Sequence, residues 1–521
     1  MMKKVAIIGA GVSGLLACKH TLEKGFNPIV FEARSCAGGI WSQTLESTKL
    51  QSPKSFYQFS DFPWPPSVTE TFPDHNQVMD YLQAYATRFN LFSRIKFNTR
   101  VISIDHLITP SGNLENVLSS NFWGGSGRSF SPFGKWNVTV QDAQNPSSPT
   151  EAYQVDFVIL CIGRYSDLPN LPEFPINKGP EVFDGKVLHS MDYAAMDDDK
   201  AAEFIKDKRV AVIGFQKSAL DVAAEVSTRN GTRHPCTLLF RTVYWTVPDH
   251  FVPFTFRNLN RFTEFMHHRP GEGFFLWILA TLLSPMLWIF SKVVELYLKW
   301  IYPLKKYKMI PGHGFLQQIS SCMFTSLPSN FYDRVEEGSL ILRKYERLNF
   351  CKNGLLVDRE MSPLATDVVI LATGFRSDEK LKNIFKSTYF QKHIAGSAPF
   401  YRDCIHPRIP QLAILGYSES PAFIYTTEMR SKWLAHFLAG KFELPSITEM
   451  GHDVLQWEKC MRRNAGEGYK RHCVSTMLQI HCNDQLCKDM GKNPWRKNSF
   501  FAELFAPYGP SDYKNLSQEC S

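Results

Sequence analysis

A glycine-rich turn close to the start of the chain constrains its fold more than any other feature. The apolar run Val5-Ala6-Ile7-Ile8 before the turn is short enough to be a buried parallel strand, and the pattern from Leu15 to Cys18 after it predicts a helix. Between them lie Gly9, Ala10, Gly11, Val12, Ser13 and Gly14. In such a unit the first glycine allows the turn, the second lets the backbone approach a pyrophosphate, and the third lets the helix pack on the strand. The segment therefore predicts a dinucleotide-binding site, with the phosphates at the N-terminus of the helix.

A carboxylate follows at the position where such a site needs a hydrogen-bond acceptor. The run Pro28–Phe31 predicts a second strand, and it ends in Glu32, roughly 20 residues after the turn, where a ribose hydroxyl is bound. Lys3 and Lys4 before an apolar run also resemble the start of a secretory signal. Because that run carries the motif glycines and no convincing cleavage site follows, we expect the segment to remain in a cytoplasmic protein.

The strand–turn–helix pattern recurs once, about 200 residues later. Arg209–Ile213 predicts a buried strand, and the turn and helix start that follow contain Gly214, Phe215, Gln216, Lys217, Ser218, Ala219 and Asp221. Gln216 stands where the second glycine is expected and adds bulk beside a pyrophosphate, so a plain strand-to-helix turn stays open as the alternative. The next strand ends in Arg241 rather than an acid. A cation there accommodates the 2′-phosphate of NADP, with Lys217 assisting, which favours NADP over NAD.

The bulk composition limits the classes of protein to which the chain can belong. Its 521 residues suffice for two or three domains with large cores, and its 44% hydrophobic and 21% charged residues are ordinary for a globular protein. The net charge of +8 is spread along the chain without a basic stripe, which argues against nucleic-acid binding. The 12 cysteines show neither a paired framework nor a zinc-type spacing, so we expect free thiols and no metal.

Two further apolar runs end in glycine and divide the chain. Phe157–Ile162 runs into Gly163, and Val368–Ala372 runs into Thr373 and Gly374, so each predicts a central strand where the chain passes between two nucleotide-binding domains. The predicted fold class is α/β, with two Rossmann-like dinucleotide-binding domains, the second inserted in the first. The expected boundaries are 1–165 for the first part of the first domain, 166–365 for the second domain with an apolar helical insertion at about 250–315, 366–450 for the return to the first domain, and 451–521 for a C-terminal helical extension.

An apolar segment inside the second domain allows two interpretations. Residues 274–290 are almost purely apolar and fall just short of a spanning helix, and Pro285 predicts a break in that helix. Aromatic residues interleave and follow the run as far as residue 302, and several lysines, including Lys299 and Lys305, lie nearby. This composition suits peripheral contact of residues 274–302 with a membrane, such as the cytosolic face of the endoplasmic reticulum. A hydrophobic wall over a substrate cavity is the second interpretation, and both stay open.

A more specific pattern lies between the two glycine turns. Its members are Phe183, Gly185, His189 and Tyr193, in the spacing Phe-x-Gly-x-x-x-His-x-x-x-Tyr. This spacing matches the fingerprint of the flavin-containing monooxygenases, and the chain resembles that family, its plant branch above all. The resemblance covers most of the chain and also rests on Gly38-Gly39-Ile40-Trp41, Phe59–Pro65, Ala372–Phe375 and Asn493–Arg496.

The resemblance implies an enzyme that holds FAD in the first turn and NADPH in the second. In the family the reduced flavin reacts with O2 to form a C4a-hydroperoxide, which passes one oxygen atom to a soft nucleophile. We expect an amine nitrogen (N-hydroxylation or N-oxide formation) or a thioether sulfur of a small metabolite, with nitrogen favoured. Gly38, Gly39, Ile40, Trp41, Thr373 and Gly374 are implied to contact the cofactors.

The same resemblance supplies the catalytic candidates, Gln51 and Ser52. They take the place of an Asn-Ser/Thr pair with which animal members help to hold flavin and nicotinamide. Gln51 keeps the amide of that Asn on a longer arm, so its hydrogen bonds can survive at altered geometry. His189 of the fingerprint is implied to position NADP and to brace the linker between the domains.

Three alternatives rest on different features. A disulfide reductase would need two closely spaced cysteines after the first turn, and Cys18 and Cys36 do not have that spacing. A Baeyer–Villiger or 2-oxo-acid-decarboxylating monooxygenase stays open, although the Baeyer–Villiger fingerprint normally ends in Trp where this chain has Tyr193. A nucleotide-binding paralogue with weak catalysis also stays open, because Gln216 alters the second turn.

Overall fold

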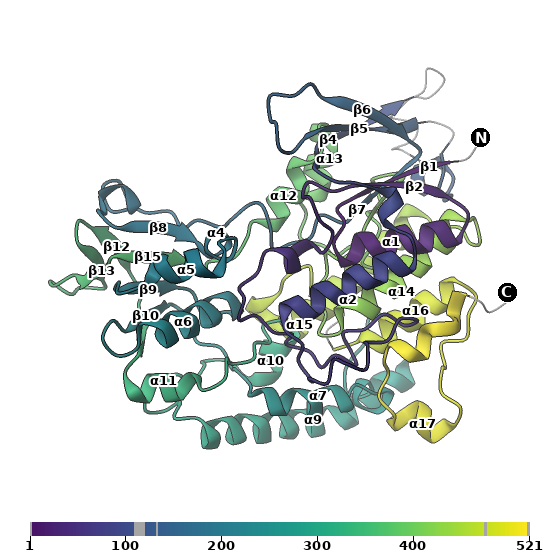
Figure 1. The fold of residues 1–521 in the computed structure, drawn as a ribbon. Coiled ribbons are helices and arrows are strands. Elements are labelled where there is room, and N and C mark those ends of the chain that lie inside the picture. Colours follow the sequence, from purple (N-terminus) through teal and green to yellow (C-terminus); the bar gives the residue numbers. More distant parts are fainter. Residues whose placement is uncertain (1–2, 109–119, 132–133, 474–476, 518–521) are drawn as a thin grey trace.

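The computed structural model describes residues 3–108, 120–131, 134–473 and 477–517, and it contains two parallel sheets surrounded by helices (Figure 1). The first sheet has the strand order β16-β7-β1-β2-β3. Its strands are β1 (Lys4–Ile8), β2 (Asn27–Phe31), β3 (Ile95–Lys96), β7 (Phe157–Leu160) and β16 (Leu412–Ile414). Both faces of this sheet are covered, which is why β1 and β7 are continuous apolar runs rather than alternating ones. Helix α1 (Val12–Glu23) follows β1 and packs against α14 (Phe423–Leu438).

The second sheet repeats this arrangement, with the strand order β11-β10-β9-β15-β8 and every pair parallel. Its strands are β8 (Lys186–His189), β9 (Val210–Ile213), β10 (Cys236–Phe240), β11 (Leu340–Lys344) and β15 (Val368–Leu371). The expected boundary at residue 366 is corrected by this sheet. β15 is fully buried between β9 and β8, so the chain returns to the first domain after residue 371 rather than before it.

The remaining elements flank these two sheets. Two small antiparallel sheets consist of β4 (Thr99–Ile108), β5 (Gly134–Asp142) and β6 (Glu151–Val155), and of β12 (Leu348–Cys351), β13 (Gly354–Val357) and β14 (Leu364–Ala365). Besides α1, α14 and the helices of the C-terminal extension, the α-helices outside the insertion in the described residues are α2 (His75–Arg88), α4 (Ser190–Ala194), α5 (Asp198–Ile205), α6 (Lys217–Asn230), α11 (Phe331–Glu337), α12 (Ser377–Asn383) and α13 (Thr388–Ile394). One buried apolar cluster runs from β1 and α1 to β9 and α6, so the two domains share a core.

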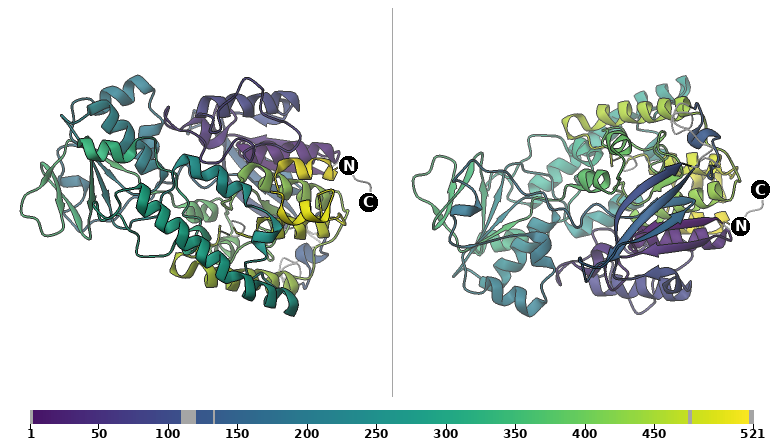
Figure 2. Two further views of the ribbon diagram at one scale, coloured as in Figure 1. Left: turned by 90° about the horizontal axis from the view of Figure 1, so that it is seen from below. Right: turned by 90° about the horizontal axis from the view of Figure 1, so that it is seen from above.

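The apolar insertion consists of α7 (Val252–Arg257), α8 (Arg261–Glu264), α9 (Phe274–Ile301) and α10 (Phe315–Ser320). The expected break at Pro285 is wrong, because α9 continues through it for 28 residues. A proline lacks the N–H that would bond to the carbonyl four residues earlier, here that of Thr281. The Ser284 hydroxyl donates to this carbonyl oxygen at 3.2 Å, so the acceptor keeps a partner and the helix does not end. Seen from below, α9 crosses the front of the molecule (Figure 2, left).

The C-terminal extension consists of α15 (Ile447–Ala465), α16 (Gln479–Asp489) and α17 (Phe500–Phe505). Arg261 of α8 joins it to the insertion, because its buried guanidinium is paired with both Asp484 of α16 and Glu503 of α17. The distance from Arg261 Nη2 to Asp484 Oδ1 is 2.9 Å. These ion pairs fix the position of α17, which lies along the same lower edge of the molecule as α9 (Figure 1).

Candidate active site

The first glycine turn has no room for side chains where it meets the neighbouring strand and its own helix. Gly9 has a φ of +102°, and a Cβ there would lie 2.5 Å from the carbonyl oxygen of Cys161. A Cβ on Gly14 would lie 1.9 Å from the Gly9 carbonyl oxygen, so this glycine lets α1 pack on the turn. Gly11 is the N-cap of α1 and makes no side-chain cap, which leaves the first N–H groups of the helix available to an anion. This turn therefore fits a dinucleotide pyrophosphate.

Glu32 lies at the end of β2, beside this turn. Its carboxylate accepts hydrogen bonds from the backbone N–H of Ala10 at 2.6 Å and of Arg34 at 2.9 Å. Arg34 in turn donates to the Gly39 carbonyl at 2.6 Å. A Cβ on Gly39 would lie 3.0 Å from Gly11 Cα, so the Gly38-Gly39 segment closes tightly over the turn. The acceptor and both glycine segments that the sequence predicts as parts of one site therefore lie together.

The second turn keeps the shape of the first and differs in its side chains. Gly214 has a φ of +144°, and a Cβ there would lie 2.3 Å from the Ala372 carbonyl oxygen. The Gln216 amide donates to Met323 Sδ at 3.0 Å, which holds this side chain against the loop after α10. Lys217 is paired with Asp221 at 2.7 Å, so the ammonium that we expect to assist Arg241 already has an anionic partner.

Arg241 lies at the end of β10, with its guanidinium 5.4 Å from the centre of the Tyr345 ring. Burial raises the pKa of Asp221 even though the Lys217 charge opposes the shift. A cation-lined turn of this kind suits a phosphorylated nucleotide.

Both turns open into a single cavity of about 1850 Å³. The predicted site residues in its wall are Gly9, Gly11, Val12, Ser13, Glu32, Gly38, Gly39, Ile40, Trp41, Gln51, Ser52, Gly214, Phe215, Gln216, Lys217, Ser218, Asp221, Arg241, Thr373 and Gly374. Ala10, Gly14 and Ala219 lie outside the lining and are buried or packed beneath the turns. Two nucleotides can therefore reach a common space.

Gln51 and Ser52 lie in the wall of this cavity and bridge separate parts of the chain. The Gln51 side-chain oxygen accepts from the backbone N–H of Ser326 at 3.3 Å, so it joins the first domain to the second. The Ser52 hydroxyl donates to the Pro421 carbonyl at 2.5 Å. Both side chains are therefore held in place at the cavity, and their assignment as catalytic residues stays a prediction.

The fingerprint residues do not line the cavity, but His189 packs against Phe375, which does. His189 Nδ1 accepts from the Met191 N–H at 3.1 Å and caps α4, and its ring packs 5.2 Å from that of Phe375, next to Gly374. Burial lowers the pKa of His189. Tyr193 is buried and donates to Glu225 at 3.0 Å.

The other two fingerprint residues, Phe183 and Gly185, pack against each other and next to the Asp367 carbonyl, which precedes β15. A Cβ on Gly185 would lie 2.3 Å from the Phe183 ring. The fingerprint residues therefore pack within the second domain, and the role in NADP positioning that the resemblance implies for His189 stays a prediction.

Sequence reasoning missed a charged cluster in the cavity wall. Arg164 follows β7 and Glu419 follows β16, and their side chains are paired at 2.6 Å. Burial opposes ionisation of Glu419, but the hydrogen bond and charge of His472 and the charge of Arg164 outweigh it and lower the pKa of this carboxyl to about 2. Both residues follow the carboxyl ends of neighbouring parallel strands, where ligands bind in such sheets. That position was the available signal.

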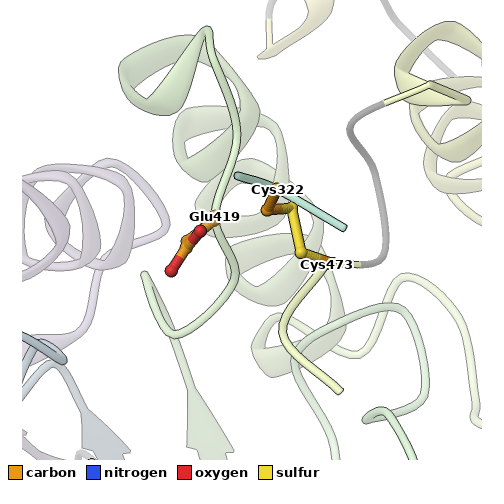
Figure 3. Close-up of side chains that lie close together, drawn as sticks. All are labelled: Cys322, Glu419 and Cys473. Carbon is orange, nitrogen blue, oxygen red and sulfur yellow. A yellow bond between two sulfur atoms is a disulfide. The ribbon is translucent and has the colours of Figure 1, made fainter. Parts of the chain in front are cut away.

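A disulfide between Cys322 and Cys473 lies beside Glu419 (Figure 3). It links the loop after α10 to the segment before α16, and Cys322 lies in the cavity wall. The expectation of free thiols is therefore wrong for this pair, because the two cysteines are 151 residues apart and only the fold brings them together.

The family model described as flavin-binding monooxygenase-like matches residues 2–122 and 125–501. The chain belongs to this family. It is 40% identical to the probable flavin-containing monooxygenase 1 of Arabidopsis thaliana, over 99% of this chain and 97% of that protein. Membership makes the protein an oxidoreductase that depends on FAD and NADPH and uses O2 with a small-molecule substrate.

Solved structures share the fold over most of the chain. The S-allyl-L-cysteine S-oxygenase of Allium sativum superposes with a TM-score of 0.57 at 18% identity, covering 95% of this chain and 89% of the other. A cyclohexanone monooxygenase bound to epsilon-caprolactone gives a TM-score of 0.66 at 15% identity, covering 94% and 97%. The predicted α/β fold with two dinucleotide-binding domains and added helices is confirmed.

Proposed function

We propose that this flavin monooxygenase inserts one oxygen atom from O2 into a soft nucleophile of a small metabolite. An amine nitrogen is the first candidate and a thioether sulfur the second. The observation that carries this proposal is the common cavity, because two nucleotide turns open into the same space of about 1850 Å³. If both nucleotides bind there, the nicotinamide would supply a hydride to the flavin, and the substrate would meet the flavin in the same space.

Each of the two glycine turns binds one cofactor. The first turn, with Glu32, holds FAD, and the second turn, with Arg241, holds NADPH. When bound, the flavin takes two electrons from NADPH and activates O2, so that one oxygen atom enters the substrate and the other leaves as water. The protein contributes placement and the exclusion of water rather than an acid–base pair.

Part of the cavity wall is apolar. Met286, Phe290 and Met323 contribute apolar surface to it. The wall carboxylate Glu419 is already neutralised by Arg164. This apolar surface suits the hydrocarbon part of a small amine or thioether. The garlic S-oxygenase of similar fold gives separate support to sulfur.

The test is a substrate screen with purified protein. We expect NADPH to bleach the yellow flavin under anaerobic conditions. On admission of air, an amine or a thioether should gain the mass of one oxygen atom. Conversion of a cyclic ketone to a lactone, with no amine or sulfide product, would favour the Baeyer–Villiger alternative. Flavin that binds but is not bleached by NADPH would favour the nucleotide-binding paralogue.

A further inference from the structure

The outward side of α9 is apolar along its whole length. Its exposed residues include Phe275, Leu282, Ile289, Val293, Leu296 and Trp300, at intervals of 7, 7, 4, 3 and 4. These intervals place all six side chains on one side of a helix. Ala280, Val294 and Leu298 are buried on the opposite side. The helix is about 42 Å long at 1.5 Å per residue. An exposed apolar strip of this length is uncommon on a protein that contacts only water.

The buried side of α9 fastens it along the surface of the protein. The Glu295 carboxylate accepts from the Phe315 N–H at 3.0 Å, and the Ser291 hydroxyl accepts from the Leu316 N–H at 3.2 Å. Among the described residues α9 is the one helix that is long and apolar enough to cross a membrane. Crossing would surround the Glu295 side with lipid and strip these polar contacts, so the packing favours a helix lying in the plane of a membrane surface.

A second element, distant in sequence, extends the same surface. Phe500 and Phe501 of α17 are exposed. The ring of Phe505 packs 5.1 Å from that of Phe262 in the insertion. Because the C-terminal extension is held to the insertion by buried ion pairs, α17 and α9 form one surface, which we call the apolar face. Both helices lie along the lower edge in Figure 1.

The charges at the apolar face fit an anionic partner. The one acidic residue within α9, Glu295, is buried and is paired with Lys292 at 2.9 Å. Lys299 of the same helix and Lys305, which follows it, are exposed. Trp288 and Trp300 are exposed among them, and tryptophan and lysine together are typical of helices at a lipid headgroup layer. A second copy of this chain would bring the same lysines against one another.

The cavity reaches this face. Met286, Phe290 and Phe505 belong to the cavity wall, and each is also exposed on the apolar face. We propose that the apolar face docks on an anionic lipid surface and that the cavity opens towards the lipid. The substrate is then an apolar amine or thioether that partitions into the membrane, an extension that rests on the proposed function.

Vesicle sedimentation tests the docking with the full flavoprotein. Vesicles of phosphatidylcholine with about a third of phosphatidylserine should carry down the wild-type protein, and phosphatidylcholine alone should carry down less. The variants Phe275→Glu/Leu282→Glu and Phe501→Glu should reduce binding at least about tenfold, because a charge replaces apolar contact. The matched control is Met361→Glu, since Met361 is 99% exposed, against 85% for Phe275, and lies outside the apolar face.

The docking proposal would be overturned by wild-type protein that stays in the supernatant with both vesicles, by equal loss of binding in Met361→Glu, or by protein that resists alkaline carbonate extraction as a spanning helix would. A dimer that the α9 variants convert to monomer, without vesicle binding, would assign the face to a second copy instead. Flavin content of each variant verifies folding in every case.

The substrate extension has its own measurement. The Phe275→Glu/Leu282→Glu variant should oxygenate a water-soluble thioether at the same rate as the wild-type protein. On a long-chain thioether offered in vesicles, its rate should be several-fold lower than that of the wild-type protein. Equal rates for both proteins would overturn lipid-side access. If no thioether or amine is oxygenated at all, the proposed function fails, while sedimentation still decides the docking.

Discussion

At the residue scale, Arg241 is the side chain on which discrimination between NADPH and NADH depends. It lies in the cavity wall beyond β10, stacked on Tyr345. A hydrogen bond to a charged group contributes about 1.5–3 kcal/mol, so Arg241→Ala should raise the dissociation constant of NADPH roughly 10- to 100-fold and change that of NADH little. The measurement is the rate of anaerobic flavin reduction against the concentration of each nucleotide.

A neighbouring arginine provides the control for that prediction. Arg343 on β11 is paired with Glu360 and does not line the cavity. Arg343→Ala should leave the affinity for both nucleotides unchanged. If Arg241→Ala weakens NADPH and NADH by the same factor, Arg241 does not bind the 2′-phosphate.

Single residues were predictable where their role is local. Gly9, Gly14 and Gly214 are required by contacts within a strand–turn–helix unit, so the spacing of the residues is enough to find them. The Arg164–Glu419 pair joins positions 255 residues apart, so the strand ends mark each position but only the fold shows that the two side chains meet. His189 was found through a family fingerprint, yet its contacts with Met191 and Phe375 show a capping and packing role that only the structure defines.

At the element scale, the junction between the insertion and the C-terminal extension depends on Arg261. Its buried guanidinium pairs with Asp484 and Glu503 and donates to the Pro494 carbonyl at 2.8 Å. Arg261→Met leaves two buried carboxylates without their cation and should destabilise the junction by about 3–5 kcal/mol. Limited proteolysis should then cut between α16 and α17 in the variant before it cuts the wild-type protein.

A variant that also neutralises the two carboxylates shows whether their unpaired charge, rather than the loss of the arginine side chain, destabilises this junction. Arg261→Met combined with Asp484→Asn and Glu503→Gln removes the unpaired charges and should recover much of the resistance to proteolysis. Proteolysis of the triple variant as fast as that of Arg261→Met would show that the unpaired carboxylates are not the cause.

The bounds and pairing of helices and strands were less predictable than single residues where they depend on a neighbouring side chain or strand. Pro285 predicts a helix break, but the Ser284 hydroxyl satisfies the carbonyl that the proline leaves free. The sequence also cannot choose the sheet that Val368–Leu371 joins, since an apolar run fits either one and pairing with β8 and β9 is non-local.

At the scale of the whole molecule, the two sheets share one strand arrangement and place their glycine turns on a common cavity. This two-domain arrangement was predictable because each nucleotide-binding domain contains a local strand–turn–helix unit that its sequence pattern reveals. The position of the insertion was not, since it depends on buried polar contacts between segments more than 200 residues apart, such as Glu264 with Ile480. The attachment of the insertion therefore depends in part on buried charged groups at that junction.

Glu264 makes the stability of the molecule depend on pH. Its carboxylate accepts from the N–H groups of Ile480 at 2.6 Å and His481 at 3.0 Å, yet burial raises the pKa of this carboxyl from 4.5 to about 7. Between these values the folded protein keeps a proton that the unfolded chain has released, so the free energy of unfolding falls as pH rises. Above pH 7 the full cost, up to about 3 kcal/mol, is present.

Glu264→Gln removes this titration and tests it. The melting temperature of the variant minus that of the wild-type protein should rise from pH 5 to pH 8 and then level off. Glu503→Gln is the control: burial opposes its ionisation, but the hydrogen bonds from Tyr508, Lys497 and Arg261 hold its pKa below the ordinary value. Glu503 is thus ionised in both the folded and the unfolded protein across that pH range. The melting temperature of Glu503→Gln minus that of the wild-type protein should therefore stay constant with pH. A flat profile for Glu264→Gln would mean that the buried carboxylate is ionised in the fold and that the junction is more polar than its packing indicates.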